Sequence, residues 1–325
     1  MNFARWFAAV LIAAALILCT RGDARAASCC GGGAASPLVI PKFAAAVAAA
    51  SIDLETYDGY WNGAGAHVAD PPGSALSQAR LSVGYARRLG DNWQAGLLAP
   101  VVMNDNRYAN ESSSSQGIGD VTANVWYEAF DNITCVYQVE SWRDLVPAVY
   151  LGGGLVIPTG VSPFDGAASS YDITGRGFYR LDAALLVEKT VFPWSVGFSY
   201  SYGIHRERPV NREYGDYVAP YTKRLGDRRS WSLSGGYTHY APGMGDLTAT
   251  VAYSDLAEGA ATIDGAAVPS SSVARRAVGV TLAWTSLDGA WVARFGFNRA
   301  PRLDGWGENF PSTDIYSLGV SHVLW

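Results

Sequence analysis

The feature of this sequence that most constrains its fold is an alternation of apolar and small polar residues with a period of two. From Trp194 to His205, for example, aromatic and aliphatic residues alternate with serine and glycine. Because successive side chains of a β-strand point to opposite faces, each such segment has one apolar and one polar face. We expect twelve strands of roughly 8–13 residues, the length that a tilted strand needs to cross a bilayer. They lie at 52–57, 80–88, 93–102, 120–130, 149–157, 180–188, 194–205, 231–238, 247–254, 278–284, 293–298 and 316–325.

The connections between these segments alternate in length. Short turns lie at 89–92, 192–193, 241–245 and 287–289, and a longer one at 131–144. Long polar loops lie at 58–76, 104–116, 158–175, 206–228, 258–273 and 301–312. Outer-membrane barrels have short periplasmic turns, long extracellular loops and an even number of strands, whereas a secreted sandwich does not require this alternation. We therefore predict an all-β fold, a transmembrane antiparallel up-and-down β-barrel in the bacterial outer membrane.

Composition argues against three other classes of protein: disordered chains, helical membrane proteins and nucleic-acid-binding proteins. Charged residues make up 16% of the chain and hydrophobic residues 49%, which does not suit a disordered chain. A helical membrane protein needs about 20 consecutive apolar residues per span, and only the N-terminal segment approaches that length. The formal net charge is −5 and no basic cluster is present. We therefore expect no nucleic-acid partner.

The N-terminus has the pattern of an export signal. Arg5 precedes an apolar run at 7–19, and Ala24-Arg25-Ala26 fits a cleavage site. We predict a signal peptide at 1–26, a periplasmic tail with a cysteine pair at 27–42, and the barrel at 43–325. A membrane anchor and a lipoprotein signal are the alternatives for the first segment.

Three cysteines remain after cleavage, namely Cys29, Cys30 and Cys135. An odd number in an exported protein indicates one thiol outside an intramolecular bridge, or an intermolecular bond. The turn at 131–144 lies on the periplasmic side if the N-terminus does, which places Cys135 on the same side as the pair. We therefore predict a disulfide from one of the pair to Cys135, and the sequence leaves open which one.

The polar face of the predicted strands has charges of both signs. A barrel of about twelve strands cannot fill its interior with large apolar side chains, so the apolar face contacts lipid and the polar face lines the lumen. The predicted lumen-lining residues are Asp53, Glu55, Arg80, Arg88, Asp120, Asn124, Glu128, Arg180, Asp182, Glu188, Arg294 and Asn298. Aromatic residues near the strand ends are consistent with interfacial girdles.

Three short stretches resemble the outer-membrane barrel family named after the phenol-degradation meta-pathway transporter. They are Gly117-Ile118-Gly119-Asp120, the stretch from Leu155 to Gly160, and Gly175-Arg176-Gly177. The resemblance implies a twelve-stranded channel for small compounds, including hydrophobic or aromatic ones.

The C-terminal strand departs from the usual ending of such barrels. Trp325 is aromatic and Val323 fits the expected frame, but Ser321 and Gly319 do not. We expect a bulge near His322 or a bend of the last residues, with Trp325 still recognised by the barrel assembly machinery.

The sequence contains no pattern that indicates catalysis. Neither a G-x-S-x-G nor an H-E-x-x-H motif is present, and His67, His205, His239 and His322 are not near one another in sequence. We therefore expect neither an enzyme nor a metal or cofactor site.

Three functions remain open. The first is a channel that passes small solutes through a polar lumen, in which the arginine-rich loop 206–228 either folds inward or stays on the surface. The second is a barrel that sheathes or docks a periplasmic partner protein, with Cys29 and Cys30 at the contact. The third is a structural or adhesive barrel without transport.

Overall fold

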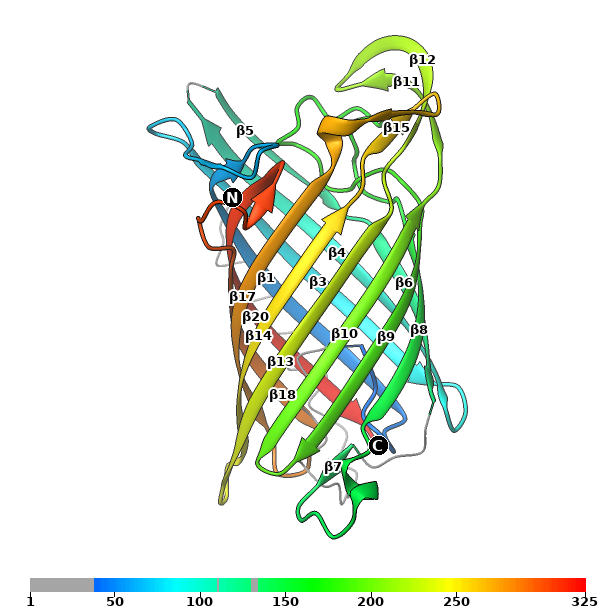
Figure 1. The fold of residues 1–325 in the computed structure, drawn as a ribbon, viewed down its shortest axis with the longest axis vertical. Helices are drawn as coiled ribbons and strands as arrows, with labels where there is room; N and C mark the ends of the chain where they lie inside the picture. The colour runs from blue at the N-terminus through cyan, green and yellow to red at the C-terminus, as the bar shows by residue number, and fades with distance from the viewer. Residues whose placement is uncertain (1–37, 110, 130–133) are drawn as a thin grey trace.

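The computed structural model describes residues 38–109, 111–129 and 134–325, and its main feature is a closed antiparallel β-barrel (Figure 1). Each barrel strand pairs with its neighbours in chain order, and the first strand closes the barrel by pairing with the last. The strands are β1 (Ala46–Trp61), β3 (Ala75–Arg88), β4 (Trp93–Tyr108), β6 (Val121–Glu128), β8 (Ala148–Ile157), β9 (Arg180–Val191), β10 (Trp194–His205), β13 (Arg228–Ala241), β14 (Gly245–Glu258), β17 (Val273–Thr285), β18 (Trp291–Arg299) and β20 (Phe310–Leu324). The predicted twelve-stranded barrel is confirmed.

The connections differ between the two ends of the barrel, as predicted. At the lower end in Figure 1, short turns join neighbouring strands, and the longer connection 129–147 contains β7 (Cys135–Val136) and a 3-10 turn (Trp142–Leu145). The upper end has the long loops and their small elements. These are β2 (His67–Val68), β5 (Glu111–Ile118), β11 (Arg208–Glu213), β12 (Asp216–Arg224), β15 (Ala261–Ile263), β16 (Ala266–Val268), β19 (Gly307–Glu308) and a 3-10 turn (Pro269–Ser271).

The two faces of the sheet differ as the alternation requires. On the outer face, Val83, Val251 and Leu282 are each more than half exposed, at 56%, 61% and 54%. On the inner face, small polar side chains bond across strands, and the hydroxyl oxygens of Ser199 and Ser232 lie 2.7 Å apart. An outer face of this kind is stable in lipid, where the closed ladder leaves no strand edge unpaired.

Aromatic pairs occupy both ends of the outer surface. The ring centroids of Trp93 and Tyr127 lie 4.9 Å apart at the turn end of β4 and β6. Those of Trp231 and Tyr253 lie 5.3 Å apart toward the loop end of β13 and β14. Their positions fit the interfacial girdles of outer-membrane barrels.

Several strands are longer than their apolar alternation predicts. β1 and β4 each have 16 residues. The segment 104–116, predicted as a polar loop, is mostly a hairpin, because β4 continues to Tyr108 and pairs with β5. Backbone pairing does not require apolar side chains, so the sheet continues beyond the part that contacts lipid.

The C-terminal half of the last strand is regular, so of the two expected irregularities the bulge near His322 is absent from the ladder. β20 pairs with β1 without a shift of register from Leu324 to Thr313. The outer frame of this strand contains Leu318 and Leu324, whereas Trp325 follows the last strand residue. The apolar frame therefore ends on Leu324 and not on the aromatic residue.

The first described residues lie against the inner wall at the turn end of the barrel. Leu38, Ile40 and Ala44 are buried in one cluster with Val47 and Ala86 on the barrel wall. The backbone N–H of Ile40 also donates to the side-chain oxygen of Gln94 at 2.6 Å. The part of the predicted tail that the structure describes therefore packs inside the barrel.

The described residues contain no helix long and apolar enough to cross a membrane.

Candidate functional site: the inner wall and the β8–β9 loop

The strand register places the predicted lumen residues that belong to barrel strands on one face of the sheet. Asp53 stands opposite Arg80 in the β1–β3 ladder, and Asn124 stands opposite Gly154 in the β6–β8 ladder. All of the predicted residues except Asp120 belong to barrel strands, and Asp120 directly precedes β6. They separate into three levels along the barrel axis.

At the turn end, the charged residues bind the N-terminal segment. A guanidinium nitrogen of Arg88 lies 3.4 Å from a carboxylate oxygen of Glu128, and the Lys42 ammonium lies 3.5 Å from the other. Arg88 also donates to the backbone oxygens of Pro41 and Ala44. Arg88 and Glu128 therefore hold a segment of the chain in place at this level.

At the middle level, a polar pocket of about 330 Å³ lies on the inner wall. Six barrel strands contribute to it, and Arg275 of β17 was not among the residues predicted from sequence. We call it the inner-wall pocket, and its lining residues are Asp53, Glu55, Gln78, Arg80, Ser254, Arg275, Asn298, Ile315 and Ser317.

At the loop end, two ion pairs lie on the inner side of the wall. Arg180 and Asp182, both of β9, are 2.7 Å apart. Arg176 and Glu258 form a bidentate pair with distances of 2.5 and 2.7 Å. The second pair joins the β8–β9 loop (158–179) to the end of β14, three strands beyond β9 in the barrel order.

The base of the β8–β9 loop is a close contact of backbone segments, which we call the glycine junction (Asp120, Gly160 and Gly175). The Asp120 carboxylate accepts backbone N–H groups of Gly160 at 3.2 Å and of Arg176 at 2.8 Å. A β-carbon on Gly160 would lie 2.6 Å from the α-carbon of Gly175. Only glycine, which has no β-carbon, avoids this steric clash. The three stretches that carry the family resemblance thus meet at one point in space.

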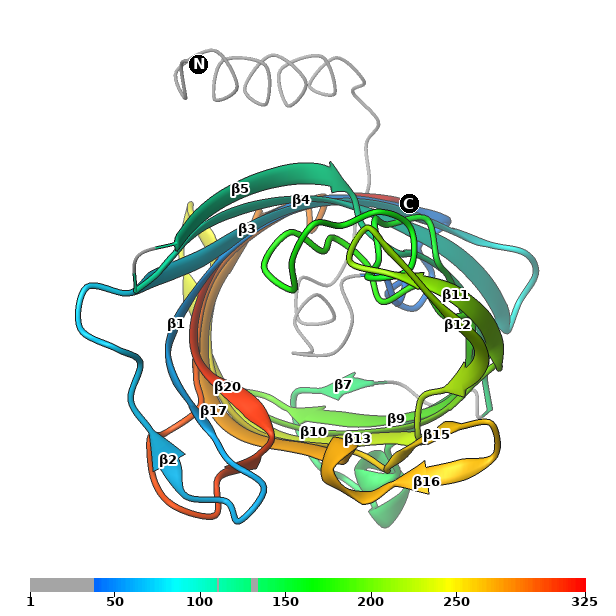
Figure 2. The same ribbon diagram turned by 90° about the horizontal axis from the view of Figure 1, so that it is seen from above.

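The rest of the β8–β9 loop contacts the hairpin of β4 and β5. The side-chain amides of Asn104 and Asn106 donate to the backbone oxygens of Ile173 and Tyr171, at 3.0 and 2.9 Å. Figure 2 shows the loop inside the barrel rim, between β4 and β5 on one side and β11 and β12 on the other. It therefore covers part of the opening.

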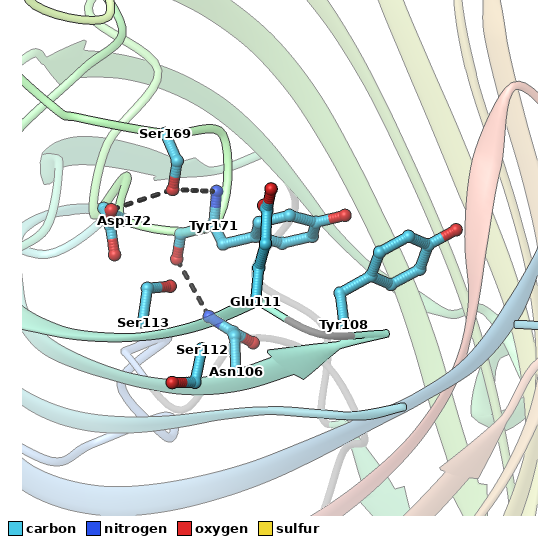
Figure 3. Close-up of a pocket in the computed structure, with 8 residues that line it drawn as sticks. All are labelled: Asn106, Tyr108, Glu111, Ser112, Ser113, Ser169, Tyr171 and Asp172. Carbon is cyan, nitrogen blue, oxygen red and sulfur yellow. Dashed lines mark hydrogen bonds between the residues drawn. The ribbon is translucent and has the colours of Figure 1, made fainter. Parts of the chain in front are cut away.

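A second pocket, also of about 330 Å³, lies at this rim (Figure 3). The rings of Tyr108 and Tyr171 stack there with centroids 5.7 Å apart, and Glu111 stands beside them. The Ser169 hydroxyl donates to Asp172 at 2.8 Å on the loop side. Burial raises the pKa of the Tyr171 hydroxyl, and Tyr108 and nearby carboxylates add to the shift.

The arginine-rich loop 206–228 does not fold into the lumen. Its strands β11 and β12 join β15 and β16 in a separate four-stranded sheet above the rim (Figure 1). Arg208 lies 2.5 Å from Asp165 of the β8–β9 loop. Partial burial raises the pKa of Asp165, but hydrogen bonds from Arg208 and Ser162 outweigh it, so the pKa lies below its ordinary value of 3.8. The inward-folding alternative is therefore wrong, and the β8–β9 loop covers the opening instead.

The cysteine prediction stays a prediction. Cys135 is buried at the start of β7, which pairs in parallel with β9. Cys29 and Cys30, like the signal peptide at 1–26, lie outside the described residues.

Two residues of this site were missed for different reasons. Arg275 lies three residues before the predicted strand 278–284, and extending its alternation backwards would have placed Arg275 on the inner face. Glu258 was assigned to a loop, and no signal in the sequence indicates its contact with Arg176, 82 residues away.

Comparison with known proteins supports the fold. No family model and no curated protein matches the sequence. An outer-membrane channel from Pseudomonas putida F1 superposes with a TM-score of 0.67 over 90% of this chain and 100% of that chain, at 14% identity. The β domain of the Bordetella autotransporter BrkA gives a TM-score of 0.50 over 86% of this chain and 100% of that one, at 12% identity. The protein has the fold of an outer-membrane β-barrel.

Proposed function

We propose that the protein is a passive outer-membrane channel for small polar solutes. The observation that carries this proposal is the contrast between the apolar outer face and the polar inner wall, where the inner-wall pocket lies. A wall with charged groups of both signs provides a path for water and hydrogen-bonding solutes. The β8–β9 loop narrows the opening, since it contacts β4, β5 and β14.

The family resemblance implies hydrophobic or aromatic solutes, whereas the pocket supports polar ones. Hydrophobic or aromatic compounds would gain little from a pocket lined by Asp53, Arg80 and Arg275. The polar lining supports the passage of polar solutes, so we propose the channel without the hydrophobic substrate.

Two further partners predicted from the sequence stay predictions. These are the assembly machinery at Trp325 and a periplasmic protein at Cys29 and Cys30. The packing of residues 38–44 inside the barrel gives no support to the docking function over the channel.

The proposal is tested by reconstituting the purified barrel in planar bilayers and in liposomes. We expect discrete ohmic conductance steps, and swelling of liposomes in isotonic solutions of small polar solutes. Heat-denatured protein in the same detergent is the control. A folded barrel that inserts but neither conducts nor admits solutes refutes the channel and supports the structural or adhesive alternative.

A further inference from the structure

The inner-wall pocket has an unusual arrangement of charge. Asp53 and Glu55 project from β1, while Arg80 comes from β3 on one side of β1 and Arg275 from β17 on the other. Two carboxylates thus lie between two guanidinium groups, and the formal charge of the four side chains is zero.

These four groups do not neutralise one another by direct contact. Within the described parts of the chain, none of them forms an ion pair with an N–O distance of 4.0 Å or less. Asp53 and Arg80 stand directly opposite in the ladder, yet each bonds to a neutral side chain. Asp53 accepts from the Ser317 hydroxyl at 2.6 Å, and Arg80 donates to the Gln78 amide oxygen at 2.6 Å.

Arg275 repeats this pattern on the far side of the pocket. It donates to the amide oxygen of Asn298 at 3.2 Å, and its Nε atom is buried without a partner among the described residues. A buried donor without a partner costs free energy, and a ligand that accepts from it recovers that cost.

We propose that the inner-wall pocket is a binding site for a small zwitterion, with its ammonium group at Asp53 and Glu55 and its carboxylate at the guanidinium group of Arg275. This inference rests on the proposed channel function and names its solute class.

The charges distinguish this class from other small solutes. A zwitterion has no net charge, as the four pocket residues together have none, and it forms charge-assisted hydrogen bonds with both signs. A neutral sugar satisfies hydrogen bonds without compensating the charges, and a simple anion or cation compensates one sign only. The pocket volume of about 330 Å³ falls within the range of small-molecule sites.

The test measures block of the ion current by L-glutamine in planar bilayers, with glucose, acetate and methylammonium as comparison solutes. We expect glutamine to block at a concentration about tenfold or more below the others, as the loss of one charged hydrogen-bonding partner implies. Asp53→Asn and Arg275→Gln should each raise the half-blocking concentration of glutamine about tenfold. Arg294→Gln is the matched control, because it removes an inner-face guanidinium outside the pocket.

Three results would overturn the site: equal block by glucose and glutamine, an equal effect of Arg294→Gln and Arg275→Gln, or no effect of either pocket variant. Calorimetric titration of glutamine into detergent-solubilised protein separates this failure from that of the channel. Conductance without block or binding heat overturns the site alone. Binding heat that requires Asp53, without conductance, supports the site and overturns the channel.

Discussion

The pair between Arg176 and Glu258 offers the sharpest test of how the β8–β9 loop controls the opening. The Glu258 side chain is 4% exposed and the Arg176 side chain 43%. Replacing one partner of a buried pair costs about 3–5 kcal/mol, and an exposed pair contributes at most about 1 kcal/mol. This pair lies between the two cases, so we expect Glu258→Gln to weaken the closed loop position by about 2 kcal/mol.

That free energy sets the size of the expected effect. About 2 kcal/mol corresponds to a change of roughly 30-fold in the ratio of displaced to closed loop. Single-channel recordings should show a higher-conductance level, and the ratio of its occupancy to that of the closed-loop level should rise by this factor in Glu258→Gln. The double variant with Arg176→Gln should add little, because both changes remove the same pair.

The matched control is Glu308→Gln, which removes a carboxylate of the loop end that bonds to Ser272 and not to the β8–β9 loop. Identical recordings for wild type and Glu258→Gln would refute the argument that this pair holds the loop over the opening. A rise of equal size in Glu308→Gln would refute it as well, because the effect would then depend on surface charge alone.

Two further predictions concern the same loop. Gly175→Ala should destabilise the glycine junction by about 1–3 kcal/mol through overpacking, since the added β-carbon would lie 2.8 Å from the α-carbon of Gly160. Thermal unfolding and conductance noise measure this effect. The control is Gly153→Ala, where the nearest atom is 3.9 Å away, and it should leave the unfolding temperature and the noise unchanged. Because the pKa of Asp165 is lowered in the folded protein, its contact with Arg208 is stabilising above the ordinary value of 3.8 and is lost as the pH falls through the lower folded pKa. Hydrogen exchange of the Tyr214 amide, which bonds to the β8–β9 loop at 2.8 Å, should then speed up below about pH 4 after correction for intrinsic rates, and equal protection at pH 3 and pH 6 would contradict the prediction.

The inner-face residues show which positions the alternation can predict and which it cannot. Asp53 and Arg80 were assigned to one face from periodicity alone, and the ladder places them opposite each other. The same reasoning stops where the apolar alternation stops, which is why Arg275 was missed and why the hairpin of β4 and β5 was taken for a loop.

The sequence did not predict the contacts between segments that are distant along the chain. The alternation placed Arg88 and Glu128 inside the barrel, but their contacts with residues 41–44 depend on how the N-terminal segment enters the barrel. The choice of 158–179 rather than 206–228 as the loop over the opening depends likewise on Asp120 and Glu258.

The sequence by itself determined the closed barrel and the polarity of its two faces, because side-chain alternation and the pairing of every backbone group in lipid leave few other folds. Tertiary structure alone decided which loop covers the opening and which charged side chains of the inner wall form no direct ion pair. Those outcomes depend on the stagger of the strands around the barrel and on loop packing, and the alternation of apolar and polar residues determines neither.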